Sequence, residues 1–566
     1  MEKLKPKLFS VMKNYSKEQF LKDFIAGIVV AIIALPLSIA LAIASGVNPE
    51  QGLYTAIVAG FFISFLGGSR VQIGGPTAAF VTIIYGIIQQ YGIDGLITAT
   101  LMAGIILIIM GFCQFGSLIK YIPYTITTGF TAGIAVTLAA GQLKDFMGLQ
   151  IASVPSEFIG KLQSYAAHID SLNLYAFAIG LLAIGIHILW PRLVTLLPNK
   201  LSKAADKLPA SLIAIIITTI IVKFLNQEQV VVATIGSSYQ NVSNALPKFH
   251  IPNMNMEMIQ NLISPAFTIA ILAGIESLLS CVVSDGMIGS RHRSNMELIA
   301  QGTGNVFSAL FGGIPATGAI ARTAANVKNG GRTPIAGIVH SITLLFVLVV
   351  LMPLAKLIPM PTLAAVLIVV AYNMSSWREF IRLLKSSPKS DGLVLLTTFF
   401  LTDIFDLVVA IEIGMVLAAI LFMKRMSEVT TMKGWDYIDN GEDDENDPDS
   451  ISYKEVPMGV AVYEIIGPMF FAATDKFLDV TTAEHGKIRV VIIRMRGVPA
   501  LDATALHSLE NLYASCKKKN IQLLFSHVQE QPYHTMEKAG FVDNVGQKHF
   551  RKNIDDALAY ANSLVS

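Results

Sequence analysis

Long apolar runs, separated by short polar connections, fill the sequence from residue 23 to residue 424. Runs of this kind predict helices that cross the hydrocarbon core of a bilayer, which is about 30 Å thick. Several runs are too short to cross as straight helices, and the two shortest each begin at a Gly/Pro break. The pattern predicts about fourteen segments, at residues 23–44, 52–68, 76–90, 94–115, 121–141, 174–190, 209–225, 264–285, 295–311, 317–327, 333–353, 361–373, 391–404 and 406–423.

The two breaks are "IGGPTAAF" at residues 73–80 and "FGGIPATGAIAR" at residues 311–322. The interval from Pro36 to Pro76 is 40 positions, as is the interval from Glu276 to Ala316, and the two pairs are offset by 240 positions. A match in spacing and in type of break indicates an internal repeat. If each half holds seven segments, an odd number, the second half is inverted in the membrane relative to the first. We therefore predict an α-helical polytopic membrane protein with a 7+7 inverted-repeat core and two half-helices.

Lysine and arginine gather on one side of these segments. The N-terminal segment and the connections on its side are rich in them, whereas the opposite side holds little more than Lys144, Lys161, Lys248 and Lys356. Positive charge marks the cytoplasmic side, so we expect both termini in the cytoplasm of a cell whose inner membrane holds the chain.

The character of the chain changes after residue 425. An acidic, turn-rich stretch is followed by strand-like runs such as "GVAVYEII" and "IRVVIIRM", which alternate with helical patterns. This alternation predicts a small cytoplasmic α/β domain. The expected divisions are a cytoplasmic N-terminal segment at 1–22, a transmembrane domain at 23–425, an acidic linker at 426–452 and the soluble domain at 453–566.

Composition supports a membrane protein and excludes other classes. The chain of 566 residues is 53% hydrophobic and only 14% charged, whereas soluble domains carry about a quarter charged residues. A net charge of +2 gives no basis for nucleic-acid binding, and the three cysteines lack the spacing of a metal site or a disulfide framework. Because the sequence shows neither a P-loop nor a nucleophile–base pair, we predict no enzyme, no metal and no cofactor.

The breaks are the candidate substrate site. An unpaired backbone group in lipid is costly, so a broken helix is tolerated only where it is buried in protein or lines a wet cavity. A half-helix that starts at Thr77 and another that starts near Thr317 would direct free N–H groups and positive dipole ends into such a cavity, where they favour an anion. The alternative is that the glycines only allow tight helix packing. The predicted anion-binding residues are Thr77, Ala78, Ala79, Ala316, Thr317 and Gly318.

Three further side chains accompany this site. Arg322 lies on the second half-helix, where its charge would favour anions over cations; a structural ion pair or snorkelling towards the surface is the alternative. Glu276 lies in the apolar run "IAILAGIESLLSC", and intramembrane carboxylates are usually partnered and functional. We predict that Glu276, with Ser280 one turn later on the same face, couples proton movement to anion movement. A buried Glu276 held by Arg322 or by backbone donors is the alternative.

Several stretches together resemble the SulP family of sulfate-permease-type anion transporters. They are "LPLSIALAIASGVNPEQGLYTA", "GPTAAF", "GIESLL", "GQGTGN" and "GGIPATGAIARTAANVK", and the resemblance extends to the soluble part, which is similar to a STAS domain with "LDATAL" at its loop-to-helix site. Within the family, the chain is most similar to bacterial aerobic C4-dicarboxylate transporters. The resemblance implies a uracil-permease-like core in which a transport domain moves against a gate domain like an elevator. It also implies a homodimer and a substrate bound between the third and tenth segments.

The resemblance also carries expectations for single residues. Pro36 and Ser38 would line the cavity from the first segment. Sodium-coupled bicarbonate members have Asp at the position of Glu276, whereas the Glu found here resembles proton-coupled members. Thr504 matches a phosphorylated Ser or Thr of STAS proteins that bind cytosolic protein partners, which gives a speculative regulatory site; capping of the following helix by Asp502 and Thr504 is the alternative.

The expected function is therefore secondary active transport of a small anion by proton symport, with succinate or fumarate as first candidates. Sulfate or bicarbonate transport, coupled to protons or sodium, is the alternative. From a different class come a passive anion channel or exchanger and a membrane-anchored regulator whose STAS domain is the working part. Glu276 separates these classes, because a channel has little use for a titratable carboxylate beside its anion site.

Overall fold

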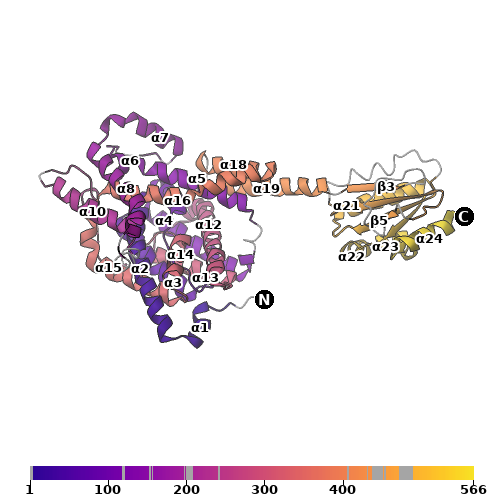
Figure 1. Cartoon of the computed structure of the whole chain (residues 1–566), viewed down its shortest axis with the longest axis horizontal. Helices are drawn as coiled ribbons and strands as arrows, with labels where there is room; N and C mark the ends of the chain where they lie inside the picture. Colours follow the sequence, from indigo (N-terminus) through magenta and orange to yellow (C-terminus); the bar gives the residue numbers. More distant parts are fainter. Residues whose placement is uncertain are drawn as a thin grey trace. The chain divides into compact units, whose positions relative to one another are not determined.

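The computed structural model describes residues 4–117, 122–151, 154–155, 157–196, 198, 208–227, 229–239, 243–404, 407–429, 431–435, 450–451, 454–470 and 488–565. The chain forms two compact units, Met1–Met415 and Val416–Ser566 (Figure 1). Much of the predicted acidic linker, residues 426–452, lies outside the described residues, so its boundaries stay a prediction.

The first half of the membrane unit is built almost entirely from helices. They are α1 (Lys7–Val11), α2 (Lys17–Ala44), α3 (Pro49–Leu66), η2 (Ala78–Phe80), α4 (Val81–Phe112), α5 (Tyr124–Gly141), α6 (Leu143–Met147), α7 (Phe158–Ala167), α8 (Leu174–Leu196), α10 (Ala210–Leu225) and α11 (Ile235–Ser238).

The second half repeats the pattern of long helices and a break. Its helices are α12 (Met256–Ile288), α13 (Ser294–Leu310), α14 (Ile320–Lys328), α15 (Ile335–Ala355), α16 (Met360–Ser375), α17 (Trp377–Ser386), α18 (Lys389–Ile404) and α19 (Leu407–Val429). Every predicted segment has a helix at its position. Helix α4 combines two of them, because Gly92 leaves the helical conformation (φ 66°) where the segments 76–90 and 94–115 were expected to part. The sequence analysis did not predict the amphipathic helix α17.

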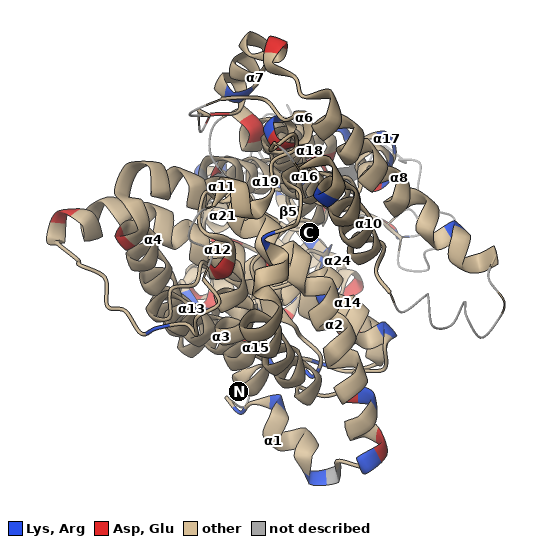
Figure 2. Ribbon diagram, turned by 90° about the vertical axis from the view of Figure 1, so that its left-hand side faces the viewer, with Lys and Arg blue, Asp and Glu red and all other residues tan. Residues whose placement is uncertain are grey.

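Length and composition confirm a multi-pass membrane protein. Of the helices in the described part of the chain, seven are long and apolar enough to cross a bilayer. Figure 2 shows charged residues along α1, the start of α2 and α7, whereas the ribbons between them are largely uncharged. Helix ends are marked by local signals: Ser16 accepts a hydrogen bond from the N–H of Gln19 at the start of α2, and Asn255 caps α12 in the same way.

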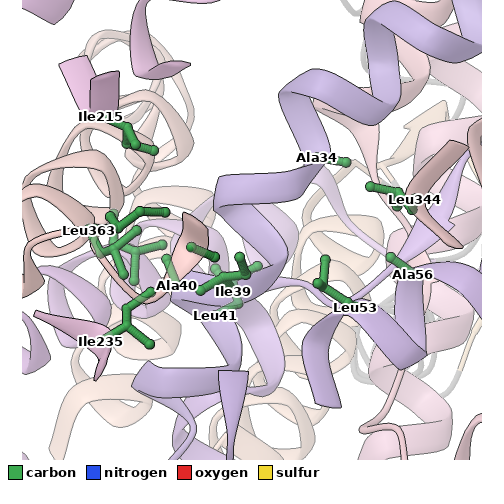
Figure 3. Close-up of a cluster of buried hydrophobic side chains, with 14 of the residues drawn as sticks. Ala34, Ile39, Ala40, Leu41, Leu53, Ala56, Ile215, Ile235, Leu344 and Leu363 are labelled. Carbon is green, nitrogen blue, oxygen red and sulfur yellow. The ribbon is translucent and has the colours of Figure 1, made fainter. Parts of the chain in front are cut away.

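The largest apolar cluster joins both halves. It contains Ile39 and Leu41 of α2, Leu53 of α3, Leu344 of α15 and Leu363 of α16, each almost fully buried (Figure 3). Small residues in α2 and α3 let the helices approach closely: a Cβ on Gly52 would lie 2.0 Å from the carbonyl oxygen of Ser38. This close packing holds α2 and α3 beside the two breaks.

The second unit is an α/β domain. A five-stranded sheet has the order β3 (Thr431–Trp435), β4 (Val460–Ile466), β5 (Val490–Gly497), β6 (Gln522–Ser526) and β7 (Phe550–Arg551), with β3 antiparallel and the other strands parallel. Side chains of β5 alternate between the two faces of the sheet. Val491 and Ile493 pack on the face covered by α21 (Ala503–Lys518), α22 (Glu530–Lys538) and α23 (Phe541–Val545). Val490 and Ile492 pack on the opposite face with α24 (Ile554–Val565). Both faces of the sheet are therefore covered.

Candidate functional site

The two breaks meet in space as a short antiparallel ladder. Strand β1 (Gly74–Gly75) pairs with β2 (Thr317–Gly318), with Gly74 opposite Gly318 and Gly75 opposite Thr317. The N–H of Ala319 also donates to the carbonyl oxygen of Ile73 at 3.0 Å. Backbone groups that no helix satisfies are thus paired across the repeat, which explains how a membrane protein tolerates both breaks. The predicted meeting of the breaks at one place is confirmed.

The half-helices begin just beyond this ladder. Thr77 is the extended N-cap residue of η2, so the helical segment begins at Ala78, one residue after the predicted start, and η2 continues into α4. Helix α14 begins at Ile320, three residues later than Thr317, because Thr317 and Gly318 are engaged in β2. Each helix start leaves N–H groups without an intrahelical partner. The junction formed by β1, β2 and the two helix starts therefore carries positive potential at its centre.

The threonines of the junction both contact α12. The hydroxyl of Thr77 donates to Oε2 of Glu276 at 3.0 Å, and both residues keep partial exposure. The hydroxyl of Thr317 donates to the carbonyl oxygen of Ala273 at 2.8 Å and is fully buried. Thr77 thus links the first break directly to the intramembrane carboxylate, whereas Thr317 fixes the second break to the helix backbone.

Arg322 extends from the first turn of α14 back to the first break. Its Nη2 donates to the carbonyl oxygen of Pro76 at 3.1 Å and to the hydroxyl of Ser38 at 3.4 Å, although the residue is 1% exposed. Its Nε and Nη1 have no hydrogen-bond partner among the residues that the structure describes. Among the described residues no ion pair joins Arg322 to Glu276. The alternative in which Arg322 holds a buried Glu276 is therefore not observed. A buried guanidinium with free donors is suited to bind a carboxylate or another oxyanion.

Two glycines of the junction make room for these side chains. A Cβ on Gly75 would lie 2.0 Å from Nη1 of Arg322, and a Cβ on Gly318 would lie 1.4 Å from Nε2 of Gln72. The packing explanation for the glycines therefore holds as well as the site explanation. The two explanations agree, because the missing side chains of Gly75 and Gly318 leave the space that Arg322 and Gln72 occupy.

Gln72 is a residue that the sequence analysis missed. Its side chain donates to the carbonyl oxygen of Ser277 at 3.2 Å and accepts from the hydroxyls of Ser280, at 2.9 Å, and Thr323, at 3.3 Å. Ser280 therefore bonds to Gln72, and among the described contacts none joins it to Glu276. Ser280 and Glu276 lie one turn apart on α12, and this spacing was the basis for predicting that they act together. The role of Ser280 in coupling is not supported by its contacts.

Both backbone groups of Ala316, a predicted anion contact, are bonded to one side chain. Its N–H donates to Oδ1 of Asn305 at 2.8 Å, and its carbonyl oxygen accepts from Nδ2 of the same side chain at 2.8 Å. An N–H that is already bonded inside the protein is not free for an anion. Ala78 and Ala79 are buried beside the junction, with Ala78 in the cluster that also holds Ile39 and Leu41. Pro36 is a buried residue of α2.

The approach to the first break is held by α13. Oε2 of Glu297 accepts from the N–H groups of Gly68 and Ser69 at 2.8 and 3.0 Å, and Nε2 of Gln301 donates to Oε1 at 2.8 Å. Glu297 is fully buried, so these bonds fix the connection that leads from α3 to β1. No cluster of His, Cys, Asp or Glu suited to a metal ion occurs in the described part of the chain.

The predicted regulatory position lies in the second unit. Thr504 is exposed in the first turn of α21, and Oδ1 of Asp502 accepts from the N–H of Ala505 at 2.8 Å. Asp502 is therefore the cap of α21, as the capping alternative expected. A phosphate role for Thr504 stays a prediction.

Replacing Asp502 with alanine is expected to destabilise the start of α21 by about 1 kcal/mol, the usual effect of losing an N-cap. Amide hydrogen exchange of the full chain should show faster exchange in the first turn of α21. Asp502→Asn retains an acceptor and serves as the control. Equal exchange rates in Asp502→Ala and the unmodified chain would contradict the capping role.

Residues 20–398 match the sulfate permease family, and residues 453–557 match the STAS domain. The "Putative sulfate transporter YvdB" of Bacillus subtilis is 39% identical over 96% of this chain and 98% of its own. The "Bicarbonate transporter BicA" of Picosynechococcus is 29% identical over 95% and 94%. Among solved structures, the murine Slc26a9 anion transporter has a TM-score of 0.84 at 18% identity, covering 99% of this chain and 94% of that one, and so shares the fold. The transmembrane domain of a cyanobacterial BicA has a TM-score of 0.61 at 27% identity over 72% and 98%.

Proposed function

The chain belongs to the sulfate permease family of anion transporters, and from this premise we propose that it is a proton-coupled symporter of a small anion. The observation that carries the proposal is the hydrogen bond from Thr77 to Glu276 beside a buried Arg322 with free donors. The junction thus holds one fixed positive charge and one carboxylate that can take up a proton. An anion binds there more favourably when Glu276 is protonated, because repulsion is then removed.

C4-dicarboxylates such as succinate and fumarate are the first substrate candidates, because the chain resembles transporters of such acids. Sulfate and bicarbonate are the second candidates, and the names of two relatives favour them: one is called a sulfate transporter and the other a bicarbonate transporter. Backbone N–H groups and a guanidinium recognise charge and size in all three. We propose that the protein lies in the inner membrane with both termini in the cytoplasm, works as a homodimer and moves its substrate-binding helices like an elevator.

Proteoliposomes test this function directly. With the membrane potential clamped at zero and the external pH fixed, a more alkaline interior should drive accumulation of labelled succinate, sulfate or bicarbonate. A gradient of one pH unit supplies about 1.4 kcal/mol per proton, enough for about tenfold accumulation with one proton per anion. Repeating the assay with and without sodium identifies the coupling ion. Flux that only equalises the anion concentrations would contradict symport and favour a channel or an exchanger.

A further inference from the structure

A cavity of about 600 Å³ lies in the membrane unit, at the end of α2 that is far from α1. Its lining comes from the ends of α2 and α5, the start of α4, helices α6 and α7, and the start of α16. Figure 1 shows α6 and α7 at the end of this unit opposite α1. In the proposed orientation, with the N-terminus in the cytoplasm, the cavity belongs to the external side. Thr77, Glu276 and Arg322 are not among its lining residues.

Lys161 of α7 is the unusual group in this cavity. The residue is only 7% exposed, yet among the described residues its Nζ makes neither a hydrogen bond nor an ion pair. The Nζ lies over the ring of Tyr85, whose centroid is 5.5 Å away. Burial lowers the pKa of Lys161. Lysine is rarely this buried without a partner. Its Nζ is not among the fully buried nitrogens without a partner, so the ammonium keeps contact with the cavity.

The other charges of the cavity do not supply the missing partner. Lys144 and Asp145 are neighbours on α6, and their opposite charges act on each other. The remaining titratable groups are the phenols of Tyr85, Tyr165 and Tyr239; the hydroxyl of Tyr85 donates to the carbonyl oxygen of Val154 at 2.9 Å. Lys161 is thus one uncompensated positive charge in a partly enclosed space.

Part of the cavity wall belongs to an apolar cluster that extends to the first break. Val81 and Leu138 line the cavity and also belong to the apolar cluster that contains Ala78, the residue after Thr77. Because Thr77, Glu276 and Arg322 do not line the cavity, a solute held there would still have to move past this apolar packing to reach the junction.

From this geometry we propose that the cavity is a second anion site, in which Lys161 binds the carboxylate or oxyanion of the incoming solute before it reaches Arg322. The order of the two sites, with Lys161 contacting the anion before Arg322, rests on the proposed transport function. The binding itself does not depend on transport. The anion would supply the partner that Lys161 lacks, as a charge-assisted hydrogen bond in a site of reduced water content.

Protection of the Lys161 amine tests binding without any transport assay. The purified full-length protein is treated with a small amine-acylating reagent, and labelling at each lysine is followed by mass spectrometry. Succinate, sulfate or bicarbonate should slow the labelling of Lys161 about tenfold, because the bound anion covers the amine and stabilises its protonated form. Exposed Lys248 provides the control at equal ionic strength. Unchanged labelling of Lys161 with all three anions would overturn the site.

Transport kinetics test its place in the cycle. Lys161→Gln should raise the KM for external anion about tenfold while the KM for anion presented from the cytoplasmic side stays unchanged. Lys161→Arg should restore most of the external affinity, and Lys248→Gln should have no effect. Equal changes on both sides would contradict an external site. If the unmodified protein transports none of the three anions but they protect Lys161, the transport proposal fails and the anion site stands.

Discussion

Replacing Arg322 with glutamine is expected to weaken anion binding about tenfold to a hundredfold. The guanidinium is buried, and within the described part of the chain two of its nitrogens have no hydrogen-bond partner, so it places a fixed positive charge with free donors at the junction of the breaks. A hydrogen bond to a charged group contributes about 1.5–3 kcal/mol, which corresponds to this range of affinity. Equilibrium binding of labelled succinate or sulfate to the purified protein measures the effect.

Two further variants separate charge from geometry at this position. Arg322→Lys keeps a positive charge but not the planar donors, and it should recover only part of the lost affinity. Gly75→Ala keeps the arginine in the sequence, but its Cβ would lie 2.0 Å from Nη1, so the substitution should displace the guanidinium and weaken binding as well. Thermal unfolding in detergent identifies variants that fail to fold. Unchanged affinity in a folded Arg322→Gln protein would exclude Arg322 from the site.

The sequence was sufficient to predict the breaks and their relation. A cluster of glycine and proline at the start of a short apolar run indicates a broken helix, whereas single prolines such as Pro36 and Pro265 stay inside helices. The repeated interval of 40 positions related Pro76 to Ala316 without any structure. The residue types at the breaks are a local signal, and the interval between them is a periodic one, so both can be read from the sequence alone. The pairing of Gly75 with Thr317 agrees with the prediction that the two breaks meet.

The contacts that complete the site could not be predicted in the same way. Gln72 bonds to residues more than two hundred positions away, and Asn305 occupies both backbone groups of Ala316 from a neighbouring helix. Such bonds depend on which helix faces approach each other, and helix spacing alone placed Ser280 with Glu276 although it bonds to Gln72. Lys161 shows the same limit: the sequence marked it as a rare external charge, but only packing makes it buried and unpartnered.

Glu276 carries the second large prediction. A carboxylate within the membrane is costly when ionised, and its one described hydrogen-bond partner is the Thr77 hydroxyl. Glutamine has nearly the same shape and keeps an oxygen that can accept from Thr77, but it cannot bind or release a proton. The substitution therefore fixes the site in the charge state that the protonated acid would have, with the positive charge of Arg322 unopposed.

Glu276→Gln is accordingly expected to bind the anion at least as tightly as the unmodified protein while losing accumulation driven by a pH gradient. Exchange of labelled for unlabelled anion should continue, because that step needs no net proton movement. The measurement compares accumulation and exchange in the same proteoliposomes at fixed external pH, so that the ionisation of the external solute stays constant. Glu50→Gln, which changes another buried carboxylate, in the first turn of α3, should leave both activities intact. If Glu276→Gln still accumulates the anion against its gradient, proton coupling resides elsewhere and the proposed role of Glu276 is wrong.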